Sequence, residues 1–192
     1  MSARSYTRRQ LMAENYVGKA PKGYRWAEYI ANNSTAYINT GVNIRNIVTS
    51  TLQMMATRKD SGNHAIYGAG NHILYVNGST RFTVWQNTTV VNIDTAINIT
   101  TGDPFKFNKI YNLQISNKDA ASSDSTLCLF ATSGPSMQFA GMRVYSCTMR
   151  VEGRIIKDFR PVCRLSDGKY GLYDIVNKQF HTSPNGVDFA GA

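Results

Sequence analysis

The sequence predicts an all-β fold in which two antiparallel sheets pack face to face. Its 192 residues suit one domain with a single core. Asn, Thr, Ser, Tyr and Val are abundant, whereas glutamate occurs only three times, and this composition favours strands and turns over helices. Many short strand-like segments separated by polar turns are typical of a two-sheet sandwich.

The strands in the body of the chain are predicted from alternating or β-branched runs that turn residues interrupt. In chain order they cover 48–57, 64–70, 72–76, 79–85, 88–93, 97–101, 109–116, 126–131 and 142–151. The polar segment 117–125 is expected to form an exposed loop.

One hairpin is predicted in more detail than the others. Asn77 and Gly78 are typical of a two-residue type I′ turn, which would join strands 72–76 and 79–85. Pairing outward from this turn assigns residues to two faces. The expected core face holds Ile73, Tyr75, Phe82 and Val84, and the expected mixed face holds His72, Leu74, Val76, Ser79, Arg81, Thr83 and Trp85.

The C-terminal segment predicts two further strands. The apolar residues within 154–160 indicate a strand, which we expect to end at Pro161 because proline has no N–H for a sheet ladder. A turn is predicted at 166–168, followed by a strand over 170–176 whose even-numbered residues share one face. The chain then turns again toward Phe180.

Both ends of this region resemble one group of modules. The matching C-terminal residues are Ile156 to Pro161, Cys163, Gly168 to Asp174, Phe180, Asn185, Gly186, Phe189 and Gly191. The matching N-terminal residues are Tyr29, Ile30, Asn32, Asn33, Tyr37, Ile38, Thr40 and Gly41. They resemble concanavalin A-like and laminin-G-like jelly-roll modules of bacteriophage structural proteins and bacterial surface proteins. The pattern departs from that group at Arg160 and Val162, which flank the proline.

The resemblance implies a jelly roll over residues 26–192. It implies a structural or adhesive role only loosely, because this fold hosts lectins, glycosidases and scaffolds alike.

Residues 1–25 are interpreted as a basic N-terminal arm. Residues 1–26 hold six basic side chains and one acidic side chain, so they carry +5 of the net charge of +9. Thr7 and Gln10 form a capping-box pattern that predicts a short helix over 8–16. The side chains expected to dock this arm onto an acidic or apolar protein surface are Arg4, Arg8, Arg9, Leu11, Met12 and Tyr16. A solvated tail is the alternative, and nucleic-acid binding is disfavoured because no groove-reading motif accompanies the charges.

The cysteines and histidines do not predict a metal site. Cys128, Cys147 and Cys163 lie in strand-like surroundings and are expected to be reduced, buried thiols, with one disulfide and a free thiol as the alternative. The histidines show none of the usual zinc spacings, and no Asp-rich cluster indicates calcium, although calcium is not excluded. No cofactor is expected.

Catalytic motifs are missing from the sequence. A glycosidase needs two carboxylates about 5 to 10 Å apart, whereas the glutamates here are isolated from one another. Asp158 and Asp174 are expected to bond backbone amides and arginines at strand ends. There is no G-x-S-x-G elbow and no phosphate loop. A non-enzymatic protein is therefore predicted.

A sugar-binding surface is the one ligand site that the sequence suggests. Sugar recognition needs an exposed aromatic ring beside polar side chains. The mixed face of the hairpin offers Trp85 with Arg81, Thr83 and His72. The alternative is that Trp85 packs inside the sandwich or against a neighbouring subunit.

The function expected from these observations is a bacteriophage virion structural protein, as a capsid decoration, head fibre or fibre component. No run reaches the roughly 18 apolar residues of a membrane span, and the N-terminus lacks a signal peptide, so we expect assembly in the host cytoplasm. The expected partners are capsid or fibre proteins, copies of the same chain and host or mucosal glycans. A bacterial surface lectin is the alternative, followed by a glycoside hydrolase.

Overall fold

A computed structural model describes residues 18–32, 35–57, 64–70, 72–77, 80–85, 87–119, 124–131 and 141–192. The described residues form strands, turns and loops, and among them no helix has the length and apolarity needed to span a bilayer. The six docking-arm residues, Arg4, Arg8, Arg9, Leu11, Met12 and Tyr16, and the predicted helix over 8–16 lie outside the described residues.

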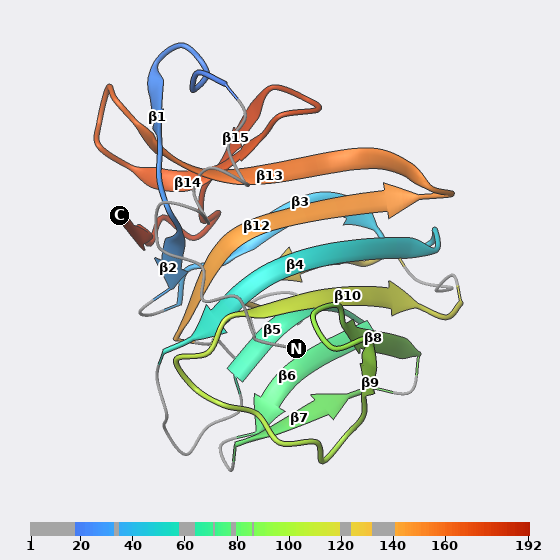
Figure 1. The fold of residues 1–192 in the computed structure, drawn as a ribbon. Helices are drawn as coiled ribbons and strands as arrows, with labels where there is room; N and C mark the ends of the chain where they lie inside the picture. Colours follow the sequence, from blue (N-terminus) through green and yellow to red (C-terminus); the bar gives the residue numbers. More distant parts are fainter. Residues whose placement is uncertain are drawn as a thin grey trace.

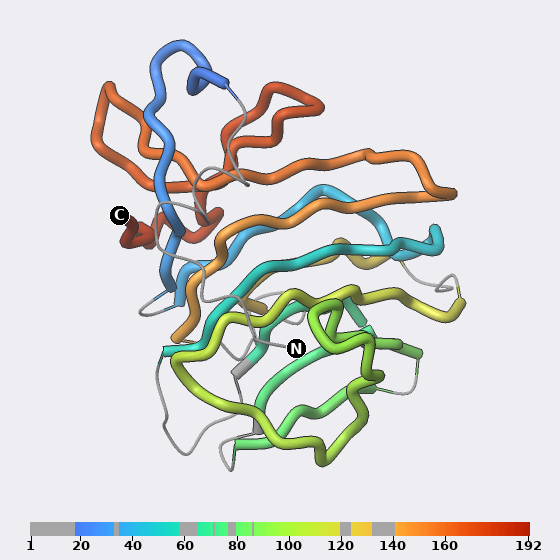
Figure 2. Tube along the Cα trace, viewed as in Figure 1, coloured from blue at the N-terminus to red at the C-terminus, as the bar shows by residue number. Residues whose placement is uncertain are grey.

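The strands form two antiparallel sheets (Figures 1 and 2). Their bounds are β1 Tyr24–Trp26, β2 Ile30–Asn32, β3 Ile38–Asn43, β4 Val48–Ala56, β5 His64–Ala69, β6 His72–Asn77, β7 Arg81–Val84, β8 Thr88–Asn92, β9 Ile97–Ile99, β10 Tyr111–Asn117, β11 Thr126–Leu129, β12 Met142–Val151, β13 Arg154–Arg164, β14 Tyr170–Asp174, β15 Gln179–His181 and β16 Ala190–Gly191. The predicted all-β architecture with two antiparallel sheets is confirmed.

The larger sheet, sheet A, has eleven strands. Its main path runs β15-β14-β13-β12-β4-β10-β8-β9, with β1 paired to β13 and β2 paired to β12 and β16. The smaller sheet, sheet B, runs β3-β11-β5-β6-β7. Figure 1 looks onto sheet A, with β3 and β5 behind it. Neither sheet closes on itself, so the arrangement is consistent with a sandwich.

The core lies between the two sheets because apolar residues alternate along the strands that face each other. In β4, Val48, Leu52 and Met54 are buried and alternate with partly exposed residues. Leu74 of sheet B and Ile115 of sheet A are buried in the same cluster. Each such side chain contributes roughly 1.5 to 3 kcal/mol when it leaves water, so this alternation fixes which face of each strand points inward.

The two ends of the described chain lie side by side in sheet A. Ala190 of β16 pairs with Ala31 of β2, and Tyr24 of β1 pairs with Arg164 of β13. Figure 2 shows the same neighbourhood, with the blue and red segments adjacent. Strand β1 begins at Tyr24, so the chain joins the sheet shortly before the predicted boundary at residue 26.

The predicted register of the β6–β7 hairpin is wrong. Asn77 pairs with Arg81 and Val76 with Phe82, so the connection spans 78–80 and has three residues rather than two. A register change of one residue turns a strand over. Leu74, Val76 and His72 therefore face the core, and Ile73 and Tyr75, which were predicted to be core residues, lie on the outer face.

Strand β13 does not end at Pro161 as predicted. It continues to Arg164, with Pro161 opposite Leu172 of β14. On its other side, β13 pairs with β12 up to Phe159 and with β1 from Val162 onward. The missing N–H of Pro161 thus falls where β13 changes neighbours, a position that tolerates proline.

The predicted turns after β13 and β14 are confirmed. Gly168 has a φ of 72° and its N–H donates to the Arg164 carbonyl at 2.9 Å, which closes the first turn. In β14, Leu172 and Asp174 are buried and Tyr173 is partly exposed, as the alternation predicted. The chain then turns into β15, which contains Phe180.

Candidate binding cleft

The predicted sugar-binding residues do not all share one face. Thr83 lies opposite Tyr75 on the outer face of sheet B, where Arg81 is also exposed. Trp85 follows β7, is 46% exposed, and donates its backbone N–H to the Ile73 carbonyl at 3.1 Å. These three residues belong to one side of the hairpin.

His72 is separated from them, and its assignment to the same face is wrong. Its side chain is 2% exposed and faces the core. The ring Nδ1 lies 3.0 Å from the Asn87 carbonyl oxygen, so this histidine has a structural contact. The error follows from the predicted two-residue turn, which reversed the faces of β6.

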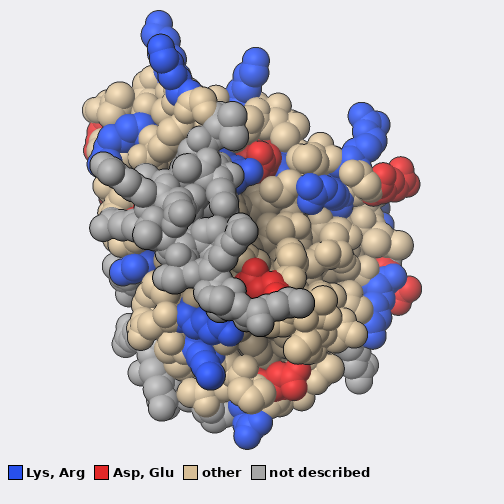
Figure 3. Space-filling model, in the orientation of Figure 1, with Lys and Arg blue, Asp and Glu red and all other residues tan. Residues whose placement is uncertain are grey.

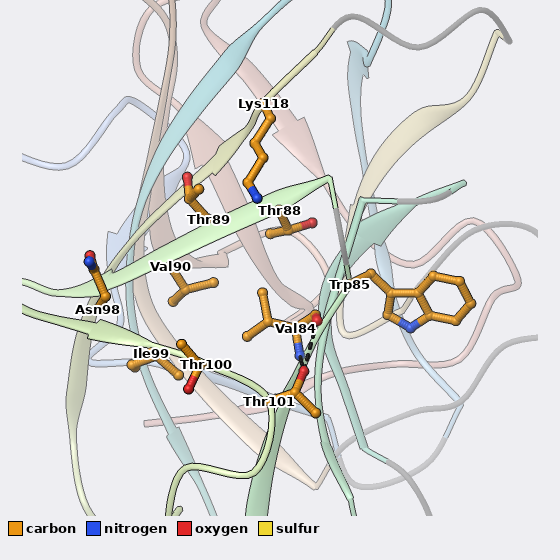
Figure 4. Close-up of a pocket in the computed structure, with 10 residues that line it drawn as sticks. All are labelled: Val84, Trp85, Thr88, Thr89, Val90, Asn98, Ile99, Thr100, Thr101 and Lys118. Atoms are coloured by element: carbon orange, nitrogen blue, oxygen red, sulfur yellow. Dashed lines mark hydrogen bonds between the residues drawn. The ribbon is translucent and has the colours of Figure 1, made fainter.

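A cleft opens beside Trp85, at the edge of the sandwich (Figure 4). It has a volume of about 310 Å³ and lies between the end of β7 in sheet B and strands β8 and β9 in sheet A. We call it the edge cleft. Its lining residues are Val84, Trp85, Thr88, Thr89, Val90, Asn98, Ile99, Thr100, Thr101 and Lys118.

The segment that follows β9 crosses to the edge of sheet B and borders the cleft. The Thr101 hydroxyl donates to the Val84 carbonyl at 2.8 Å and accepts from the Val84 N–H at 2.9 Å. The Phe82 N–H donates to the Asp103 carbonyl at 2.9 Å. This segment therefore satisfies the edge of β7, which would otherwise present unpaired backbone groups.

The floor of the edge cleft is apolar. Val90 and Ile99 are opposite each other on β8 and β9, and both are buried. Val84 comes from the facing sheet (Figure 4). The indole ring of Trp85 points away from these side chains and stands at the rim.

Thr88 lines the edge cleft, but its hydroxyl oxygen is enclosed by protein atoms. The residue is 5% exposed, and its Oγ1 has no hydrogen-bond partner among the described residues. A buried polar group without a partner costs about 1 to 3 kcal/mol of stability. Such a group is uncommon in a folded protein and calls for an explanation.

Lys118 contributes the only charged side chain of the described lining. It follows β10, and its backbone N–H donates to the Asn87 carbonyl at 2.9 Å. In Figure 4 its ammonium group ends beside β8, and the Thr88 hydroxyl points away from it. Among the described residues no carboxylate forms an ion pair with it.

On the face that Figure 3 shows, the positive charge of the described residues is spread rather than concentrated. Figure 3 shows lysine and arginine side chains around much of the periphery of the visible face. Several of them pair with acids, as in the contact between Arg45 and Asp124 at 2.7 Å. The turn containing Arg45 borders a second, larger cleft of about 610 Å³, which Arg150 also lines.

The carboxylate of Asp174 has a structural role. It is fully buried and accepts hydrogen bonds from the N–H groups of Asp158 and Val176 at 3.2 and 3.1 Å. Asn177 donates to it at 2.6 Å, and the Lys157 ammonium lies 3.0 Å away. Burial would raise the pKa of Asp174, but the bonds from Asn177 and Lys157 outweigh it and hold the pKa below its usual value.

Asp158 is also part of the framework. Its carboxylate lies 3.0 Å from the Arg160 side chain and accepts a bond from the Thr148 hydroxyl at 3.2 Å. The expectation that these two acids bond amides and arginines is confirmed, with the amides at Asp174 and the arginine at Asp158.

The three cysteines are free and buried, as predicted. Burial raises the pKa of the Cys128 thiol to about 11 and also raises that of Cys147, so these thiols carry little thiolate at neutral pH. Within the described part of the chain, no three His, Cys, Asp or Glu side chains are grouped as metal ligands.

Comparison of the chain with family models, with curated proteins and with solved structures finds no significant match.

Sequence reasoning identified Trp85 but missed Thr88 and Lys118. The sequence did contain a sign of Thr88, because alternate residues of β8 face the core. Thr88 lies two positions before Val90 and therefore faces the core as well. A threonine at an inward position is a polar group that needs a partner. Lys118 gave no signal, since its proximity to β8 depends on the pairing of β10 with that strand.

Proposed function

We propose that this chain is a non-enzymatic structural protein of a bacteriophage particle, which displays a jelly-roll sandwich and adheres to glycans through it. The observation that carries the proposal is the position of the two segments that resemble phage jelly-roll modules. They are far apart in sequence, yet β2 pairs with β16 in one continuous region of sheet A. The resemblance therefore covers a unit of structure rather than two unrelated fragments.

The roles of the acidic residues support a structural function. Asp158 and Asp174 lie in the segments that carry the resemblance. The Asp174 carboxylate joins β14 to β13, and the Asp158 carboxylate bonds Thr148 of β12 and Arg160. Both carboxylates are engaged in contacts that hold neighbouring backbone and side chains in place. The edge cleft supplies a concave site that combines apolar and polar side chains, as small-ligand sites do.

The basic arm, residues 1–25, is the proposed attachment to capsid or fibre proteins. We expect a variant lacking residues 1–22 to fold but to be lost from purified particles, as measured by immunoblotting of gradient-banded virions. The double variant Arg8→Ala/Arg9→Ala should reduce incorporation, and the charge-matched control Arg150→Ala/Arg154→Ala should not. Wild-type incorporation of the truncated chain would contradict docking through the arm, and absence of the intact chain from particles would contradict the virion assignment.

A bacterial surface lectin is the second candidate, because the edge cleft and Trp85 suit adhesion without any particle. Adhesion is tested with a glycan array. We expect Trp85→Ala to reduce binding and Ile97→Ala, which also removes an exposed apolar side chain, to leave it unchanged. Equal binding by all three proteins would remove the proposed contribution of Trp85.

A further inference from the structure

We propose that the outer face of the β6–β7 hairpin binds an oligosaccharide, with Trp85 and Tyr75 stacking on two different pyranose rings of the same chain. This inference rests on the adhesion part of the proposed function. It adds a second aromatic contact and states that the ligand must contain more than one sugar ring.

The strand register places both aromatic residues on the outer face of the hairpin. Tyr75 of β6 lies opposite Thr83 of β7. The Trp85 N–H donates to the Ile73 carbonyl at 3.1 Å, which continues the same pairing beyond the end of β7. Because residues two apart in a strand share a face, these four residues lie on one surface. We call the surface formed by Ile73, Tyr75, Thr83 and Trp85 the hairpin platform.

The hairpin platform is accessible to a ligand. Trp85 is 46% exposed, and the other three residues are partly exposed. The residues between them, Leu74, Val76 and Phe82, are buried in the core, so the platform residues are not needed there. Neighbouring apolar side chains on an open surface are typical of a contact site, whereas single ones are ordinary.

The positions of the two aromatic residues favour a ligand longer than one ring. Tyr75 and Trp85 are diagonal to each other on adjacent strands, and such positions are about 7 to 8 Å apart. In Figure 4 the indole points away from the floor of the edge cleft, so it presents its ring outside that cleft. One pyranose can cover one aromatic ring, and two linked pyranoses can cover both.

Polar groups lie beside the aromatic rings. Thr83 is opposite Tyr75 and two positions before Trp85, so a hydroxyl lies between the two stacking positions. Arg81 is exposed on the same face and donates one N–H to the Gly102 carbonyl. A guanidinium has five N–H donors, so others remain for sugar hydroxyls. Aromatic faces beside donors and acceptors are the combination that sugar recognition requires.

The test is a ligand-detected NMR titration of the full chain with N-acetylglucosamine and with its β-1,4-linked tetramer, whose rings present flat C–H faces. We expect the tetramer to bind at least about tenfold more tightly than the monosaccharide, because only the tetramer reaches both aromatic rings. Trp85→Ala should weaken the binding of both sugars. Ile97→Ala, which removes an exposed side chain on β9, should change neither.

Two substitutions of Tyr75 separate stacking from a structural role. Tyr75→Val removes the ring but keeps a residue that favours strands, so it should weaken tetramer binding about tenfold and leave monosaccharide binding unchanged. Tyr75→Phe keeps the ring and removes only the hydroxyl, so it should bind both sugars like the wild type. Wild-type tetramer binding by Tyr75→Val, or its loss in Tyr75→Phe, would overturn stacking on Tyr75.

The outcomes also distinguish this inference from the proposed function. Equal affinities for the monosaccharide and the tetramer would overturn the two-ring platform. No binding of either sugar, together with Trp85-dependent signals on the glycan array, would overturn the platform and leave adhesion in place. No binding in either experiment would overturn both.

Discussion

The two ends of sheet A differ in how completely their buried polar groups are partnered. At the end that contains β13 to β15, the carboxylate of Asp174 is fully buried and has four partners. At the end that contains β8 and β9, the hydroxyl of Thr88 is buried and has none among the described residues. The Asp174 carboxylate therefore stabilises the first end, whereas at the second end the Thr88 hydroxyl lacks a partner among the described residues.

The packing of the two ends differs in the same way. In β14, a Cβ added to Gly171 would lie 2.4 Å from the His181 carbonyl oxygen, so β14 and β15 approach each other too closely for any side chain. Near β9, in contrast, Ile97 is 62% exposed and the cleft reaches between the sheets. Close packing leaves no room for a ligand, whereas the loose edge provides it.

The largest effect that tests this comparison is expected from Asp174→Ala. The substitution leaves the Lys157 ammonium and two backbone N–H groups without their acceptor, and breaking a buried pair typically costs about 3 kcal/mol or more. Urea denaturation should show this loss in the free energy of unfolding.

Asp188→Ala is the matched control. Asp188 also pairs with a lysine, Lys169, at 2.8 Å, but both side chains are largely exposed. Its removal should cost less than about 1 kcal/mol. Similar losses for Asp174→Ala and Asp188→Ala would mean that the β13–β15 end does not depend on its buried carboxylate.

The contrast between the two ends also shows where the sequence was sufficient to predict the local structure. The alternation over β14 and the turn residues at Gly168 are local signals, and both were predicted correctly. The hairpin of β6 and β7 was not, because Asn77 and Gly78 match a two-residue turn whereas the register is fixed by burial of Leu74 and Val76. Tertiary packing overrode the local turn preference there.

The candidate site shows the same limit. Trp85 could be identified because an aromatic residue near polar neighbours is visible in the sequence. The edge cleft could not, because it forms where the segment from Thr100 to Phe105 returns to the edge of sheet B. That return joins residues about twenty positions apart through contacts that have no periodic pattern.

A pH dependence of intermediate size is expected at the well-packed end. Burial, followed by the charge of Lys157, lowers the pKa of His181, whose ring also packs edge-on against Phe159. As the pH falls below about 6.5, the unfolded chain binds a proton that the folded chain resists, so the free energy of unfolding decreases. The slope for one group is at most about 1.4 kcal/mol per pH unit.

The lowered pKa of Asp174 acts in a separate window at lower pH. Below about 3.9 the unfolded carboxylate takes up a proton while the folded one stays ionised, so its stabilisation is lost as the pH falls further. Equilibrium unfolding between pH 8 and pH 3 should therefore show two descending steps. His181→Gln should abolish the upper step and keep the lower one, and an unchanged upper step would assign it to another group.

The smallest expected effect concerns the hairpin whose register the sequence did not predict. Thr80, the last residue of the 78–80 connection, has a φ of 72°, a conformation that a β-branched residue adopts only at a cost. Thr80→Gly should relieve about 1 kcal/mol of strain, partly offset by the greater freedom of glycine in the unfolded chain. The melting temperature should rise slightly.

Thr83→Gly, in the same hairpin, should change the melting temperature in the opposite direction. Thr83 lies in extended β7 opposite Tyr75, so glycine removes a cross-strand contact without relieving any strain. We expect this variant to melt at a lower temperature than the wild type. Destabilisation by both variants would show that the connection of β6 and β7 depends on the Thr80 side chain, and the hairpin edge would then be as closely built as the β13–β15 end.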